Sequence, residues 1–213
     1  MNQLEPTDST VRAEFFKLGG ALLFLIGIVY FVSSITVEIT ANHTFLIISA
    51  VIGGYMALNI GANDVANNVG PAVGSKAITL MGAIFIAIIF ESAGALVAGG
   101  EVVSTIKKGI IDPSLINDAD TFIWLMLAAL LAAAIWLNAA TFVGAPVSTT
   151  HSIVGGVLGA GIAAGGFGIA NWAVFGKIAA SWVISPVLGG VIAASFLYLI
   201  KRTITYREDM LQA

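Results

Sequence analysis

Five amide or carboxyl side chains lie within ten residues of an otherwise apolar part of the chain: Asn59, Asn63, Asp64, Asn67 and Asn68. If this segment is helical, the three asparagines spaced four residues apart share one face, with the other two side chains beside it. Amide and carboxylate oxygens bind hard cations, and backbone carbonyls freed by a helix break at Gly61 would add to them. The segment therefore predicts a site for Na⁺, or for a proton carried by Asp64. The alternative is that the amides only join helices through hydrogen bonds.

A second polar cluster, Pro146-Val147-Ser148-Thr149-Thr150-His151, lies within a stretch of 56 residues that has no charge. A proline followed by hydroxyl residues predicts a helix start, with Pro146 as the first helical residue. The free N–H groups at such a start bind anions, and the hydroxyls of Ser148, Thr149 and Thr150 would add donors. The alternative is an ordinary helix cap. The two clusters together predict a combined cation and anion site, the usual construction in secondary transporters.

Two further residues have two interpretations each, and one glycine pair indicates helix packing. Glu91 stands alone in an apolar run, where a carboxylate costs roughly 2.5–3.5 kcal/mol, so it either pairs with a neighbour or has a gating or coupling role. His151 either titrates and orients the hydroxyls or is a satisfied hydrogen-bonding residue. Gly155 and Gly159 have the spacing that permits close helix packing. Ser148 with His151 lacks a third group to orient it, so we do not expect an enzyme.

The composition requires a membrane protein. Of the 213 residues, 58% are hydrophobic and 10% are charged, and mean hydropathy is +0.99. Long stretches of the chain carry no charge and so have no polar face for water, and several reach the 20 or so residues that cross a bilayer. A net charge of −3 indicates no nucleic-acid partner, and the lack of cysteine excludes disulfides and thiolate metal sites.

The pattern predicts an all-α integral membrane protein of about five transmembrane helices plus a re-entrant helical hairpin. Residues 1–17 form a polar tail, 18–37 a first transmembrane helix (or, alternatively, a secretory signal), and 201–213 a polar tail. The predicted segments between them are 44–59, 77–98, a short amphipathic stretch at 101–111, 122–143, a hairpin or half-helix at 146–166, and 172–200. We expect a multi-pass protein of the cell membrane, in the inner or plasma membrane.

Residues 61–67, Gly-Ala-Asn-Asp-Val-Ala-Asn, and residues 146–151 closely resemble the two signatures of the inorganic phosphate transporter family. Residues 90–94 and 106–112 also resemble that family's first half, in the same order. The resemblance implies a symporter that moves inorganic phosphate with Na⁺ or H⁺, with no other cofactor. It places the coupling ion at Asn63, Asp64 and Asn67, with Na⁺ on the first two. It places phosphate at Ser148, Thr149, Thr150 and Asn67.

Each signature occurs once here, whereas the family carries the pair twice in inverted repeats. Residues 44–200 therefore resemble one repeat half, and 18–37 is an additional helix before it. A second half would come from a lost part of the same chain, a split partner or an antiparallel homodimer. Sulfate or a related oxyanion is the alternative substrate, although Asp64 would repel a fully ionised anion. The alternative function is a non-transporting accessory subunit.

Overall fold

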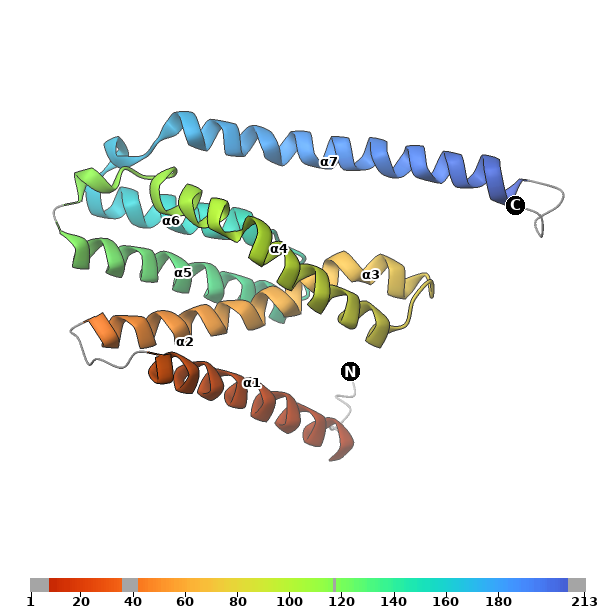
Figure 1. The fold of residues 1–213 in the computed structure, drawn as a ribbon, viewed down its shortest axis with the longest axis horizontal. Helices are drawn as coiled ribbons and strands as arrows, with labels where there is room; N and C mark the ends of the chain where they lie inside the picture. The colour runs from red at the N-terminus through yellow and green to blue at the C-terminus, as the bar shows by residue number, and fades with distance from the viewer. Residues whose placement is uncertain (1–7, 36–41, 117, 207–213) are drawn as a thin grey trace, which may run out of the picture. The chain divides into compact units, whose positions relative to one another are not determined.

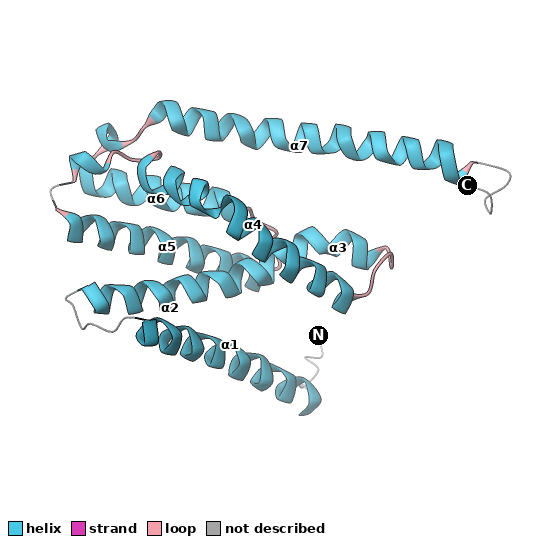
Figure 2. Cartoon of the chain, viewed as in Figure 1, coloured by secondary structure: helices cyan, strands magenta, loops and turns pink. Residues whose placement is uncertain are grey.

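The computed structural model describes residues 8–35, 42–116 and 118–206, and within them the chain is helical, with no strand (Figures 1 and 2). Five helical segments are long and apolar enough to cross a membrane: Phe15–Ile35, His43–Gly74, Leu80–Ile106, Ala119–Phe142 and Trp172–Ile204. The predicted fold class is thus confirmed. The chain forms two compact units, Met1–Ala170 and Asn171–Ala213.

The first unit begins with α1 (Asp8–Ile35), which packs along α2 (Asn42–Ile60). The helix starts ten residues before the predicted 18–37 span, so the part of the 1–17 tail from Asp8 onward is helical. The two helices approach closely at Gly54, where a Cβ atom would lie 2.7 Å from the Cδ1 atom of Ile28. Gly54 thus lets α1 cover one side of α2.

The predicted interruption at Gly61 is wrong. The chain stays helical from α2 through a π-helical turn, Gly61–Val65, into α3 (Ala66–Gly74). A π turn inserts one residue without ending the helix, so it changes which side chains face a neighbour. The polar cluster therefore lies on a widened turn of a continuous helix.

The predicted separate segments 77–98 and 101–111 are joined in one helix, α4 (Leu80–Lys108), and residues 77–79 and 109–111 lie outside it. Nothing at the Gly99-Gly100 pair ends the helix, because glycine lowers helix propensity without removing a hydrogen bond. The helix ends at Gly109, where a Cβ atom would lie 2.6 Å from the carbonyl oxygen of Thr105. Steric contact at Gly109, which only glycine avoids, thus marks the end of α4.

The connection from α4 to α5 (Ala119–Phe142) is organised by two aspartates outside the apolar segments. Asp112 accepts hydrogen bonds from the N–H and hydroxyl of Ser114, and Asp118 accepts the same pair from Thr121. These hydrogen bonds favour the ionised carboxylates and lower the pKa of both aspartates. Asp118 thereby caps the start of α5.

Helices α5 and α6 (Thr149–Gly165) run antiparallel as a hairpin (Figure 1). Of the two interpretations of 146–166, the half-helix is the one observed, and its hairpin partner is the preceding helix. Close packing comes from Gly156, where a Cβ atom would lie 2.7 Å from the carbonyl oxygen of Ala129. The expectation for Gly155 and Gly159 is wrong, because a Cβ atom on either would meet nothing within 4 Å. The direction of each glycine around the helix axis decides this difference.

The second unit contains α7 (Trp172–Ile200), whose bounds are those of the predicted 172–200 span. It has Pro186 within it and continues into a π-helical turn, Lys201–Thr205, so the predicted tail at 201–213 begins as helix. Edge-to-face contacts join Phe175 to Trp172 and Trp182. The residues beyond 206 lie outside the described part of the chain.

We expect Gly156→Ala to lower the free energy of unfolding of the purified protein in detergent by about 1–3 kcal/mol, because the added methyl overlaps the backbone of α5. Gly159→Ala is the matched control on the same helix, since both substitutions bring the same gain in helix propensity and only one meets a neighbour. Unfolding followed by tryptophan fluorescence measures the difference. Equal melting temperatures for the two variants would contradict the close packing.

Candidate functional site

The structure brings the two polar clusters together through the side chain of Asn63, which is 5% exposed. Its amide nitrogen donates to the Thr141 hydroxyl at 3.1 Å and to the Ala145 carbonyl at 3.0 Å. Its amide oxygen accepts from the Val147 N–H and from the Asn67 amide, both at 3.1 Å. An asparagine amide can donate two hydrogen bonds and accept two, so Asn63 is fully satisfied. It ties the π turn to the hairpin tip.

One turn earlier on α2, Asn59 makes a second connection to α5. Its oxygen accepts a hydrogen bond from Asn138 at 3.1 Å, and its nitrogen donates to the Tyr55 carbonyl at 2.8 Å. The alternative interpretation of the amides, that they join helices, therefore describes Asn59 and Asn63 in this structure. Analysis of the sequence missed their partners Asn138 and Thr141, although each is an isolated polar residue in an apolar span.

Asp64 differs from its neighbour. Its side chain is half-buried, and among the described residues it forms no hydrogen bond or ion pair. Asn67 is exposed and donates to Asn63, which leaves its amide oxygen without a protein donor in the same part of the chain. The π turn and the first turn of α3 thus offer a carboxylate and an amide oxygen to a ligand. No group of three or more His, Cys, Asp or Glu side chains that could hold a metal occurs in the described residues.

The hairpin tip begins with Gly144, whose φ of +71° suits glycine, and leads into α6. Helix α6 starts at Thr149 with Ser148 as its cap, so Pro146 is not the first helical residue as predicted. The Ser148 hydroxyl oxygen accepts from the His151 N–H at 3.4 Å. The helix starts later because this serine supplies the capping oxygen that a proline cannot.

The three predicted hydroxyl residues have different surroundings. Ser148 and Thr150 are exposed, whereas Thr149 is 8% exposed and its Oγ1 atom has no hydrogen-bond partner in the described residues. Burying a hydroxyl without a hydrogen-bond partner costs free energy. Such a hydroxyl at a helix start is therefore suited to donate to an oxygen atom of a bound anion. His151, also exposed, follows in the first turn.

Glu91 is not joined to the tip. It lies exposed on α4 and, with Asn68, lines a groove of about 730 Å³ between α4 and the helix that contains the π turn. Its predicted pairing with a neighbour is not found among the described residues. Hydrogen bonds thus connect Asn63 to its neighbours in the turn and the tip. Glu91 and Asn68 are not part of this network and line the groove instead.

Comparison with known proteins gives the family of this chain. Residues 60–213 match the model of the phosphate transporter family, which covers most of the chain, the first polar cluster except Asn59, and the whole second cluster. The chain belongs to the phosphate transporter family. The resemblance found in its motifs is thereby confirmed.

Relatives of this family member include a "Putative phosphate permease" of Helicobacter pylori strain J99, 55% identical over 209 residues, which cover 98% of this chain and 39% of the relative. A protein of the same description from Pyrococcus horikoshii is 47% identical, covering 78% of this chain and 41% of the relative. A solved structure titled "The sodium-dependent phosphate transporter" is similar, with 44% identity, a TM-score of 0.73, and coverage of 78% and 42%. The chain spans about two fifths of the length of these proteins.

For this family member we expect Asn63→Leu to lower the free energy of unfolding by about 1–3 kcal/mol, because it leaves the Thr141 hydroxyl, the Ala145 carbonyl and the Val147 N–H without their partner. Asn68→Leu is the control, since this exposed side chain makes no hydrogen bond among the described residues. Thermal unfolding in detergent is the measurement. If both variants have the same melting temperature as the unaltered protein, Asn63 does not hold the tip.

Proposed function

We propose that this chain is one half of a transporter that moves inorganic phosphate with Na⁺ or H⁺ across the cell membrane. The observation that carries the proposal is the buried Thr149 hydroxyl at the start of α6, which has no hydrogen-bond partner among the described residues. Asn63, in the same π turn as Asp64, holds the segment before α6 by accepting a hydrogen bond from the Val147 N–H. Family membership and the sodium-dependent neighbour support phosphate as substrate and Na⁺ as the coupling ion.

Phosphate would bind where α6 begins. The N–H groups of the first turn and the positive end of the helix dipole favour an anion without a full cationic charge. Ser148, Thr149 and Thr150 would donate their hydroxyls to its oxygens, and Asn67 would lie at its edge. Near neutral pH phosphate keeps at least one hydroxyl, which can donate a hydrogen bond to a carboxylate such as Asp64. Sulfate is fully ionised and has no such donor, so this site favours phosphate over sulfate.

The coupling ion would sit on Asp64, the one carboxylate of the π turn. Neutralising it with Na⁺ or a proton removes its repulsion of an arriving anion, so ion and phosphate would bind cooperatively. The oxygen of Asn63 already accepts two hydrogen bonds and would join the Na⁺ ligands only when the Val147 or Asn67 donor moves away. Where the Val147 N–H is the donor that moves away, coordination by Asn63 would be linked to movement of the hairpin tip, which would change access to the site.

A second repeat half would complete the site. Asn67, Ser148 and Thr150 are exposed, and the family's proteins are more than twice as long. The missing half would come from the rest of a longer chain, a split partner or an antiparallel second copy. Glu91 and His151 are the gating or coupling candidates, since both are polar and exposed.

We expect Thr149→Val in the complete assembly to weaken phosphate affinity about 10- to 100-fold, since one hydrogen bond to a charged group is worth about 1.5–3 kcal/mol. We expect Asp64→Asn to abolish the dependence on the coupling ion. Uptake of radiolabelled phosphate by proteoliposomes, with the Na⁺ and pH gradients varied separately and sulfate as competitor, measures both effects.

Thr105→Val is the matched control, because this hydroxyl donates only to the Glu101 carbonyl within α4. Unchanged ion dependence in Asp64→Asn would refute the coupling role. Equal loss in Thr149→Val and Thr105→Val would refute the anion site. Full uptake by the other half without this chain would instead assign it an accessory role.

A further inference from the structure

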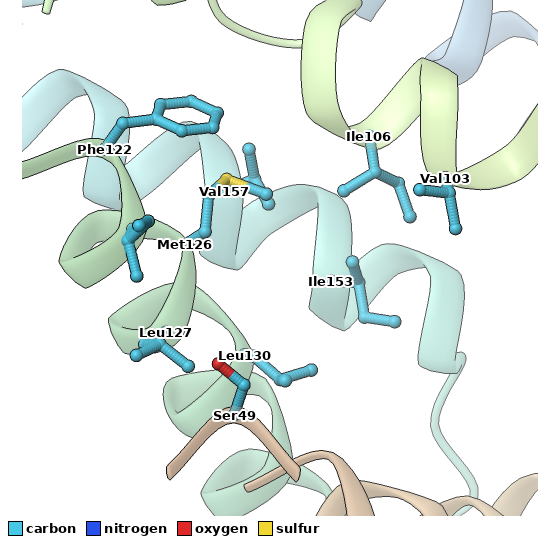
Figure 3. A pocket seen from close by; sticks show the side chains of 10 residues that line it. Ser49, Val103, Ile106, Phe122, Met126, Leu127, Leu130, Ile153 and Val157 are labelled. Carbon is cyan, nitrogen blue, oxygen red and sulfur yellow. The ribbon is translucent and has the colours of Figure 1, made fainter. Parts of the chain in front are cut away.

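A cavity of about 440 Å³ lies among four helices of the first unit. Figure 3 shows side chains from α2, α4 and both hairpin helices around this one space. Its volume is in the range of cavities that hold a small ligand. It adjoins neither the Asn63 amide nor the hydroxyls of the tip, so the proposed phosphate site does not account for it.

The walls of the cavity offer water almost no polar partners. Nine of the ten lining residues are apolar, and the exception is Ser49. The Ser49 hydroxyl already donates to the Phe45 carbonyl at 2.6 Å. A buried water needs two to four polar partners, so these walls favour an apolar occupant.

The lining of the cavity follows the helix axes. On α5 the lining residues recur from Phe122 through Met126 to Leu130, a stripe of two turns that is about 12 Å long. Ile153 and Val157 continue the lining along α6, one turn apart. An apolar lining that follows a helix for two turns fits a linear aliphatic chain better than a compact ligand.

The surroundings supply such a chain. The α2, α4 and α5 walls belong to segments that are long and apolar enough to cross a bilayer, so the cavity runs along the direction of the lipid tails. We propose that the cavity binds one acyl chain of a membrane phospholipid. This inference does not depend on the proposed transport of phosphate.

Occupancy would act on the hairpin, because residues of both its helices line the cavity together with residues of α2 and α4. A bound chain would contact all four helices at once. The acyl chain is therefore a structural ligand of the element that carries the tip.

The test uses the full chain in nanodiscs that contain a phosphatidylethanolamine with a photoreactive diazirine on its acyl chain. After irradiation, mass spectrometry of peptides should show labelling concentrated on Met126, Ile153 and Val157. Leu130→Trp, which fills the cavity, should reduce that labelling at least fivefold. Leu131→Trp is the matched control, because its side chain is 38% exposed and does not line the cavity, and it should leave the labelling unchanged.

Ser49→Leu narrows the cavity from α2 with a side chain that suits an apolar helix, and it should reduce the same labelling if Leu130→Trp does not fold. Competition separates the source of the chain: unlabelled phosphatidylethanolamine should compete, and free palmitate should not. The proposal is overturned if labelling is spread evenly over the lipid-exposed residues of α5 or if Leu130→Trp and Ser49→Leu label like the unaltered protein. It is also overturned if palmitate alone competes.

Discussion

A polar group surrounded by hydrocarbon has to find its hydrogen-bond partner within the protein, and the arrangement around Asn63 depends on that constraint. Three of the four hydrogen bonds of one amide join segments 78 to 84 residues apart in the sequence. The fourth connects Asn63 to Asn67, one turn further along the same helix. This side chain, together with the Asn59–Asn138 hydrogen bond, links the helix that contains the π turn to the hairpin.

Because the hydrogen bonds of Asn63 are all made within the protein, the polar groups left to bind a ligand are those of neighbouring residues. The Asp64 carboxylate and the Thr149 hydroxyl have no hydrogen-bond partner in the described residues, although each is next to a residue or segment that is firmly held. This combination suits a transport site, which needs a rigid frame and polar groups that a passing ion can use. A site whose polar groups all bonded one another would hold the helices together but would bind nothing.

The hairpin obtains its stability from close packing. Lipid tails are as apolar as the side chains they surround, so helices in a bilayer gain little from hydrophobic burial and depend on small residues that let backbones approach. Alanines 129, 133, 134 and 140 are buried along α5, and Gly156 faces Ala129 from α6. By contrast, larger apolar residues of α5, among them Phe122, Met126 and Leu130, line the cavity. The same hairpin is thus tightly packed along one face and open to an apolar ligand along another.

The sequence by itself determined the helical membrane fold, the family and the two polar clusters, because composition, hydropathy and short motifs are local properties. It also placed α7 to the residue, since charged or polar residues bound that span on both sides. Only the tertiary structure decided that the helix continues through Gly61, that α4 is a single helix, and that Gly156 rather than Gly155 or Gly159 faces a neighbour. It likewise decided that Thr149 is buried while Ser148 and Thr150 are exposed. These outcomes depend on the rotation of each helix about its axis and on partners many residues away, neither of which a local pattern contains.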